Sequence, residues 1–170
     1  VGKMAALNYG IKKTSSKYVA FTDQDNIIIS PSWLKILKSN FTSDDVGYVG
    51  GKVILYQTKT QAQIKWEEKG ALNKGDKRLE LDKNFFQKFR LKGVPVNICT
   101  VGSNHIMPRK VLEQIGWHDK RFGPGALIEG AGGDLHIPYR VLRKGYKVIY
   151  DPKAIIGHEH PKSFSLLRQK

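Results

Sequence analysis

Two aspartates separated by one residue follow a short apolar segment. Residues 19–26 read Val-Ala-Phe-Thr-Asp-Gln-Asp-Asn, so Asp23 and Asp25 come directly after a predicted strand. Because side chains alternate along a strand, both carboxylates can point to the same side at its carboxyl end, where open α/β sheets bind ligands. Two such oxygens suit Mg²⁺ or Mn²⁺, which can bridge the phosphates of a nucleotide. The alternative is a polar turn, because Asp and Asn are common where strands end.

The composition indicates one folded domain. The chain has 170 residues, of which 40% are hydrophobic and 26% are charged, values that are ordinary for a globular protein and exclude a disordered tail. The single cysteine, Cys99, excludes an intramolecular disulfide and fits a reducing compartment. No apolar run approaches the roughly 20 residues of a membrane span, and the start has no secretory pattern. We therefore expect a cytoplasmic location.

The net charge of +14 favours an anionic partner. Nucleic acid, an anionic membrane surface and phosphorylated substrates all qualify. The sequence has no helix-turn-helix, zinc-ligand or aromatic ribonucleoprotein pattern that would direct the charge at bases. We therefore expect no nucleic acid partner. Peripheral attachment to the inner face of an anionic membrane is the interpretation that we prefer. A solvated basic surface is the alternative.

Helical and extended patterns alternate along the first half of the chain. Ser30 can cap a helix in which Pro31 takes the first position, and Gly50-Gly51 indicates a bulge within a long strand. Residues 73–95 are basic and mixed, and we interpret them as a mobile insertion. The remaining elements predicted here are a helix over 4–11, a strand over 18–22, a strand over 46–56 and a helix over 61–72.

The second half continues the alternation. Residues 96–107 look extended, and Pro108 opens a short helix that runs to Ile115. The glycine-rich stretch 123–134 leads to a helix that carries Tyr139, and residues 147–150 form a last strand. The whole pattern predicts an α/β fold.

Several motifs, in order, resemble those of family-2 glycosyltransferases, which have the Rossmann-like fold called GT-A. The resemblance covers nearly the whole chain and implies an open mixed sheet flanked by helices. The matching segments are Gly2-Lys3-Met-Ala-Ala-Leu-Asn8-Tyr-Gly10, Asp23-Gln-Asp25, Pro31-Ser-Trp33-Leu34, Val101-Gly-Ser103-Asn104, Arg109, Gly116-Trp-His-Asp119, Arg121-Phe-Gly-Pro-Gly125, Gly132-Gly-Asp134, Tyr139-Arg140-Val-Leu-Arg-Lys-Gly145, Tyr150-Asp-Pro152 and His158.

The resemblance implies metal-dependent transfer of a sugar from a nucleoside-diphosphate sugar to a hydroxyl of a carbohydrate or lipid-linked acceptor. It implies Mg²⁺ or Mn²⁺ as cofactor and cell-envelope or exopolysaccharide sugars as products. Asp25 is then the first metal ligand, Asp23 lies nearer the ribose or a metal-bound water, and His158 is the third contact. Alternatively, His158 is a structural histidine whose hydrogen bonds are satisfied at the end of a strand. His160 is a further candidate for the third metal contact. Lys3 and Asn8 become donor-binding residues.

Asp134 is the candidate for the base that an inverting transferase needs. The preceding glycines, Gly132 and Gly133, allow close approach of substrate, and a carboxylate at a helix start is stabilised by the helix dipole. Taken alone, the residues favour a simple helix cap, whereas the resemblance favours the base. The resemblance also places Ser103 and Asn104, with both glycines, on the acceptor side.

The chain departs from the family pattern in three places. Gly133 stands where the family usually has Glu, and Glu129 is the nearby carboxylate that can compensate. Pro138 falls close to the predicted helix start, where its missing amide costs a hydrogen bond. The chain also opens on the donor-site helix, from which we expect a fragment without the nucleotide-base-binding segment. We divide it into a donor and metal half, 1–60, and an acceptor and catalytic half, 96–160.

Two other classes of protein share some of these features. A magnesium-dependent phosphohydrolase can use the first Asp of an Asp-x-Asp strand to accept a phosphoryl group, but that class places its motif on the first strand of the domain. Here a helix precedes the motif. A non-enzymatic, basic nucleic-acid-binding module is the third alternative, and strongly salt-dependent binding of DNA or RNA would support it.

Overall fold

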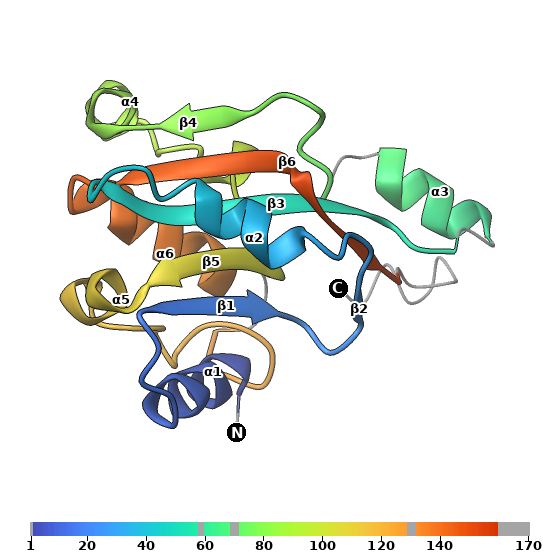
Figure 1. Cartoon of the computed structure of the whole chain (residues 1–170), viewed down its shortest axis with the longest axis horizontal. Helices are drawn as coiled ribbons and strands as arrows, with labels where there is room; N and C mark the ends of the chain where they lie inside the picture. The colour runs from blue at the N-terminus through green and yellow to red at the C-terminus, as the bar shows by residue number, and fades with distance from the viewer. Residues whose placement is uncertain (1, 58–59, 69–71, 129–131, 160–170) are drawn as a thin grey trace.

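The computed structural model describes residues 2–57, 60–68, 72–128 and 132–159. These residues form a mixed six-stranded sheet with helices on both faces (Figure 1), which confirms the predicted α/β class. The elements are α1 (Lys3–Lys12), β1 (Tyr18–Thr22), β2 (Asn26–Ile28), α2 (Trp33–Ser39), β3 (Val46–Leu55), α3 (Gln61–Glu68), β4 (Leu79–Leu81), α4 (Lys83–Phe89), η1 (Val96–Ile98), β5 (Asn104–Pro108), α5 (Arg109–Ile115), α6 (Gly132–Arg143) and β6 (Lys147–His158).

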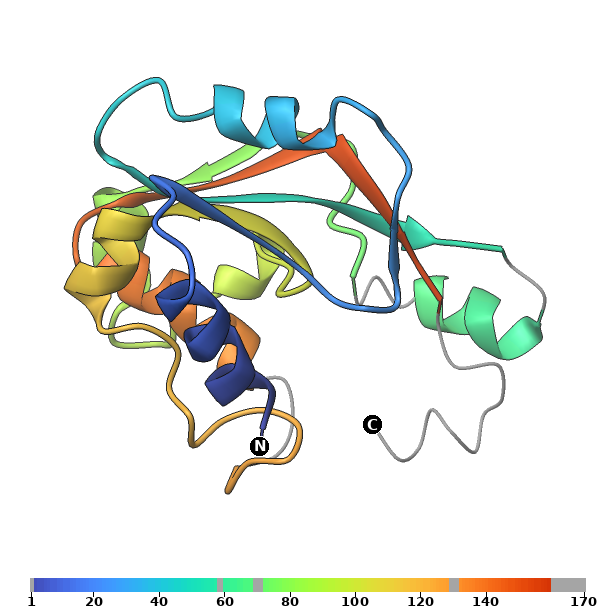
Figure 2. The same cartoon turned by 60° about the horizontal axis from the view of Figure 1, so that its bottom comes forward.

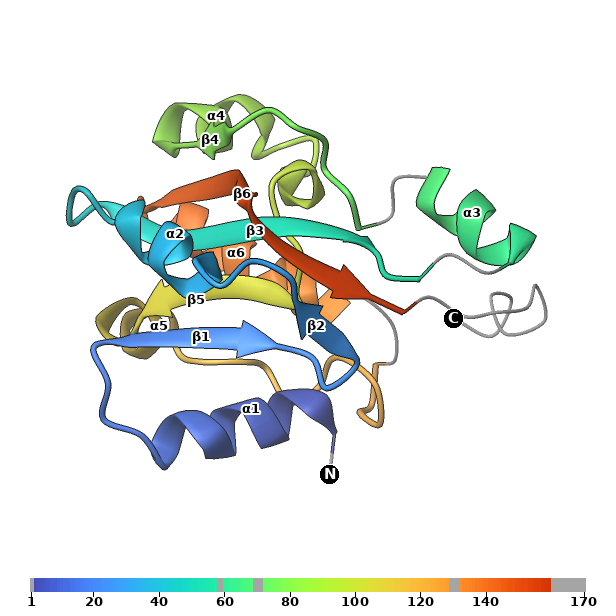
Figure 3. The ribbon, with the colours of Figure 1, turned by 45° about the vertical axis from the view of Figure 1, so that its right-hand side comes forward.

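The strands follow the order β1-β5-β3-β6-β2, and β4 also pairs with β6. Only β3 and β6 are parallel, and the other pairs are antiparallel. The first part of β6 pairs with β4, whereas its last residues, Ile156 to His158, pair with β2. As a result, the residues that follow β1 in sequence lie beside the end of β6 (Figure 3).

The alternation of side chains along the strands builds one core on each face of the sheet. Tyr48 and Val148 point toward α1, α5 and α6, while their neighbours Val49 and Ile149 pack under α2. Figure 2 shows α2 on one side of the sheet and α1, α5 and α6 on the other. Each adjacent pair in the central strands therefore contributes to both cores, as the two-residue period of a strand requires.

The β3–β6 ladder is irregular near the predicted glycine bulge. Gly51 is opposite Asp151, but Lys52 is opposite Ile155, so the register shifts at this point and the additional residues lie in β6 rather than in β3. A side chain at Gly51 would overlap the backbone carbonyl of Ala154 and the side chain of Asn104. Glycine is therefore required here by close packing.

Three boundaries differ from the sequence expectations. Helix α2 begins at Trp33 rather than Pro31, because the Ser30 carbonyl accepts from the Trp33 amide (3.0 Å) and closes a turn before the helix. Residues 96–98 form a 3₁₀ turn instead of extended chain. Strand β6 continues well beyond Tyr150, since Pro152 lies within the register irregularity, where its missing amide is tolerated.

The segment 73–95 contains two elements that the sequence did not predict. Strand β4 pairs with β6, and its Leu81 is buried in the core. Asp82 then caps α4, because its carboxylate accepts from the Phe85 amide (2.8 Å). The segment thus extends the sheet. The helix expected over 61–72 is observed as α3, Gln61–Glu68, and residues 69–71 lie outside the described residues.

Among the helices of the described ranges, none combines the length and the apolar character that crossing a bilayer requires.

Candidate active site

The two aspartates lie in a turn between β1 and β2, not on the strand itself. The Asn26 amide donates to the Asp23 carbonyl (3.2 Å), and the Asn26 side chain donates to Thr22 Oγ1 and to the Ser103 carbonyl (3.0 Å each). Asn26 therefore closes the turn and ties it to the segment before β5. Because β1 ends at Thr22, the turn rather than strand alternation sets the directions of the two carboxylates.

Asp23 faces the first residue of α1. The Lys3 ammonium lies 3.0 Å from both oxygens of Asp23 and 3.6 Å from Oδ1 of Asp134. Lys3 therefore stands between a carboxylate of the donor half and the candidate base. Burial by itself lowers the pKa of Lys3, but the charges of Asp134 and Asp23 and the hydrogen bonds to them outweigh burial, so the pKa lies above its ordinary value. The ammonium stays charged at neutral pH.

Asp134 occupies the first turn of α6, and its carboxyl group packs against Gly102. A side chain at Gly102 would overlap that carboxyl group. Burial raises the pKa of Asp134, Lys3 offsets part of the rise, and the charge of Asp23 adds to it, so the pKa lies above its ordinary value. A carboxylate with a raised pKa is a stronger base once it is ionised. About a third of the side chain (35%) remains exposed, so a substrate can reach it.

Asp25 pairs with the other end of the chain. Its Oδ2 lies 3.4 Å from Nε2 of His158, the last residue of β6, and this contact becomes an ion pair when the imidazole is protonated. The carboxylate is half exposed and the imidazole is largely covered. A carboxylate oxygen suits Mg²⁺ or Mn²⁺, and a neutral imidazole nitrogen is a common metal ligand, so these two residues fit a divalent cation.

The three predicted metal ligands are not gathered into one cluster. Asp23 is turned to Lys3, whereas Asp25 and His158 form a pair. Within the described ranges, no group of three or more His, Cys, Asp or Glu side chains is arranged to hold a metal ion. His160 lies outside those ranges.

The two asparagines predicted as site residues, Asn8 and Asn104, make buried hydrogen bonds to distant parts of the chain. Asn8 is buried, and its side chain donates to the His118 carbonyl (2.8 Å) and accepts from the His118 amide (3.0 Å). Asn104 is fully buried: it accepts from Trp33 Nε1 (2.7 Å) and donates to the Lys52 and Ala154 carbonyls (2.9 Å each). The hydrogen bonds described for these two amides thus go to backbone groups and to the Trp33 indole, and none of them joins an amide to a candidate carboxylate.

The other residues predicted on the acceptor side differ in how deeply they are buried. Ser103 is buried, and its carbonyl accepts from Asn26. Gly133 is buried against Met4, while Gly132 is exposed at the start of α6. Glu129 lies outside the described residues.

Sequence reasoning missed Gly102. It stands within the quoted Val-Gly-Ser-Asn segment, so the motif contained the signal, but only the fold shows that the absence of a side chain there makes room for Asp134.

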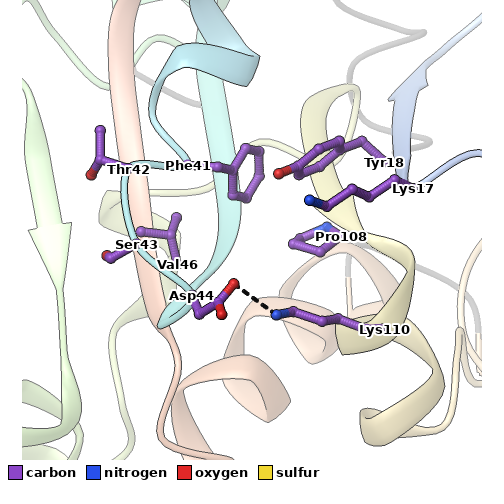
Figure 4. Close-up of a pocket in the computed structure, with 9 residues that line it drawn as sticks. All are labelled: Lys17, Tyr18, Phe41, Thr42, Ser43, Asp44, Val46, Pro108 and Lys110. Carbon is purple, nitrogen blue, oxygen red and sulfur yellow. Dashed lines mark hydrogen bonds and ion pairs between the residues drawn. The ribbon is translucent and has the colours of Figure 1, made fainter.

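A pocket of about 260 Å³ lies at the other end of β1. It is lined by Lys17 and Tyr18 of β1 and its approach, by Phe41 and Asp44 of the loop before β3, and by Lys110 of α5 (Figure 4). A Lys110–Asp44 ion pair (2.9 Å) crosses it. Because Asp23 follows the opposite end of the same strand, this pocket is not part of the carboxylate site.

Solved structures of similar fold include glycosyltransferases. A mannosyltransferase, PcManGT, from Pyrobaculum calidifontis, in complex with GDP-Man and Mn²⁺, has a TM-score of 0.59 at 17% identity over 96% of this chain and 38% of its own. GalNAc-T7 with UDP, GalNAc and Mn²⁺ has a TM-score of 0.59 at 15% identity over 94% of this chain and 30% of its own. A mycobacterial protein has a TM-score of 0.51 at 13% identity over 98% of this chain and 47% of its own.

These likenesses establish the fold, and this chain spans less than half the length of each of the three proteins. A comparison with curated proteins found no match. The family model described as glycosyltransferase like family 2 matches residues 1–170, the whole chain. The chain therefore belongs to the family-2-like glycosyltransferases.

Proposed function

We propose that this domain transfers a sugar from a nucleoside-diphosphate sugar to a hydroxyl group of a carbohydrate or lipid-linked acceptor, with inversion at the anomeric carbon. The observation that carries the proposal is the placement of Lys3 between Asp23 and Asp134. It links a carboxylate on the donor half to a partly exposed carboxylate whose raised pKa suits a base. Family membership favours this function over the phosphohydrolase and nucleic-acid alternatives.

Each residue of the site then has a distinct task. Asp134 takes the proton from the acceptor hydroxyl, whose oxygen attacks the anomeric carbon while the bond to the nucleoside diphosphate breaks on the opposite face. Gly102 leaves space for the Asp134 carboxylate, and Lys3 holds that carboxylate in place. Asp23 lies on the donor side of Lys3, where it is available to the ribose.

A divalent cation fits the Asp25–His158 pair. We propose that these two residues hold Mg²⁺ or Mn²⁺, which when bound neutralises charge on the diphosphate leaving group. The carboxylate and imidazole of the pair support the proposal, and both solved glycosyltransferases described above contain Mn²⁺. Asp25 is half exposed, so an ion can enter from solvent.

Two further features of the function are the location of the domain and the class of its products. We propose a cytoplasmic domain that attaches to the inner face of an anionic membrane through its positive charge, and cell-envelope or exopolysaccharide sugars as products. The net charge of +14 supports attachment to an anionic membrane, and the resemblance of the motifs to those of family-2 glycosyltransferases supports such sugars as products.

A nucleotide-sugar screen tests the transfer. Thermal shift with a panel of nucleotide sugars, with and without Mn²⁺, should identify a donor that raises the melting temperature only with the metal. With that donor, NMR of the transferred sugar in an acceptor product should give the opposite anomeric configuration. Retention of configuration would contradict the direct role of Asp134, and the absence of any metal-dependent donor would contradict the proposed function.

A further inference from the structure

A second pocket, of about 310 Å³, lies between the end of α5 and the last turns of α6. Arg140, Arg143 and Lys144 line it together with Gln114 and His136, and none of its described lining residues is a carboxylate. Ile137, Val141 and Leu142 form the buried side of α6, and the pocket is bordered by Ile115 and Tyr139, which pack against the core. Positive charge thus converges on a hollow of the surface.

The three cations of this pocket, Arg140, Arg143 and Lys144, differ in the partners that the described residues offer them. In the part of the chain that the structure describes, neither Arg143 nor Lys144 forms an ion pair. The Arg140 guanidinium donates to the carbonyl of Ile115. Asp119 attracts Arg140, but Arg121 already holds the Asp119 carboxylate at 2.6 Å. The positive charge is therefore available to a ligand.

Two partly buried groups of the pocket have lowered pKa values. Burial lowers the pKa of Arg140, and the charge of Asp119 opposes this shift. Burial also lowers the pKa of His136, the charge of Arg140 lowers it further, and the charge of Asp119 opposes both. Nδ1 of His136 is buried without a hydrogen-bond partner among the described residues. An anion in the pocket would stabilise both charged forms.

The pocket also offers a neutral donor. The Gln114 side-chain oxygen accepts from the Tyr146 hydroxyl (2.5 Å), which orients the amide and leaves its NH₂ group available. Two guanidinium groups, an ammonium and an amide match an anion with several oxygens, since guanidinium binds phosphate through paired N–H donors.

We propose that this pocket binds a phosphate or diphosphate group. The cation set fits the charge of such a group, and the paired N–H donors of the guanidinium groups match its oxygens. The proposal does not depend on sugar transfer. The same helix carries Asp134 in its first turn, so a ligand here contacts the element that positions the proposed base.

Calorimetry with inorganic pyrophosphate, in buffer with EDTA, tests the pocket on the whole chain. We expect binding that the double variant Arg143→Gln/Lys144→Gln weakens by about tenfold or more, the scale of lost charge-assisted hydrogen bonds. The matched control is Lys35→Gln/Lys38→Gln, which removes the same charge from exposed positions on α2, on the other face of the sheet. It should bind like the unmodified protein. The proposal is overturned if both double variants weaken binding equally. It is also overturned if the protein binds neither pyrophosphate nor phosphate nor the vesicles described below.

A second measurement distinguishes the source of the phosphate. Cosedimentation with phosphatidylcholine vesicles, with and without phosphatidic acid, shows whether a lipid headgroup is the source. If only the binding of vesicles depends on Arg143 and Lys144, the ligand is the headgroup. If only the binding of pyrophosphate depends on them, the ligand is a free phosphate. NMR titration of His136 gives an independent readout: saturating pyrophosphate should raise its pKa. An unchanged His136 titration at saturation contradicts binding in this pocket.

Discussion

The Lys3 ammonium lies 3.6 Å from Oδ1 of Asp134, so the first residue of α1 contacts the first turn of α6. Lys3 is at the same time 3.0 Å from Asp23. Two carboxylates from separate parts of the chain thus share one cation, and the protonation of Asp134 depends on a residue near the start of the sequence. The first two predictions follow from this arrangement.

Asp134→Asn removes the proposed base while nearly preserving its shape. Because the base acts only in the transfer step, donor affinity should stay nearly unchanged while transfer falls by roughly 10²-fold or more. Calorimetry gives the first quantity and a transfer assay the second. Retained activity would show that Asp134 only stabilises the first turn of α6, where a carboxylate interacts favourably with the helix dipole. Glu129→Gln, made in parallel, tests whether that carboxylate is the base instead.

Lys3→Met should move the acidic limb of the pH–rate profile to higher pH. The Asp134 pKa is already raised, and without the ammonium the burial and the charge of Asp23 raise it further. Asp134 must be ionised to act as a base, so a higher pKa means that activity rises only at higher pH. The profile of kcat/KM against pH is the measurement, and Lys3→Arg is the control that keeps the charge. If the acidic limb of the Lys3→Met profile did not move, Lys3 would not influence the pKa of the base.

Asp25→Asn should weaken metal-dependent donor binding, because it replaces a charged oxygen with a neutral one. His158→Gln should have the same effect if the two residues share the ion. Asp23→Asn should affect the metal less and the nucleotide comparably, since its carboxylate is paired with Lys3. Calorimetry with a nucleoside diphosphate and Mn²⁺ compares the three variants. Unchanged affinity and metal dependence in Asp25→Asn would remove this residue from the site.

Gly102→Ala should reduce transfer more than donor binding. The added carbon would overlap the Asp134 carboxyl group, which must shift, and overpacking of this kind costs about 1–3 kcal/mol. The matched control is Gly10→Ala in α1, where no atom lies near the added carbon and the helix should gain about 1 kcal/mol. Urea unfolding and a transfer assay measure both effects. Full transfer by Gly102→Ala would show that the close contact is not needed for catalysis.

His105→Phe should make the fold less sensitive to acid. The His105 ring is buried and stacked between Phe21 (4.6 Å between centroids) and Tyr48 (4.7 Å), and neither ring nitrogen has a hydrogen-bond partner in the described residues. Burial, with the charges of His118 and Lys3, lowers the pKa of His105 to about 3. The ring is therefore neutral in the folded state and takes up a proton on unfolding below pH 6.5.

The sign of the effect follows from proton uptake. The stability that depends on neutral His105 is present above pH 6.5 and is lost as the pH falls toward about 3, with a slope of up to about 1.4 kcal/mol per pH unit. His118, whose burial lowers its pKa to about 4, adds a similar slope that the variant retains. Unfolding free energies at pH 7 and pH 5 should differ less in His105→Phe. Equal differences would contradict a neutral buried ring.

The sequence by itself determined which residue types are available for chemistry and which elements carry them. Asp23, Asp25 and Asp134 were identified from short motifs, and strand β1 and helix α1 from local patterns, because propensity and periodicity act over a few neighbouring residues. Strand β4 was not identified, because its three residues form a strand only through pairing with β6, which is distant in sequence.

Only the tertiary structure decided which of these residues face one another. The sequence predicts Asn8 on the donor side and Asn104 on the acceptor side, and the structure adds that both are buried and hydrogen-bonded to distant segments, Asn8 to His118 and Asn104 to Trp33, Lys52 and Ala154. Lys3 meets Asp134, and Asp25 meets His158, because the packing of α1 and α6 beneath the sheet and the pairing of β2 with β6 bring distant segments together. Such contacts depend on how whole layers pack, and no local pattern of residues encodes that.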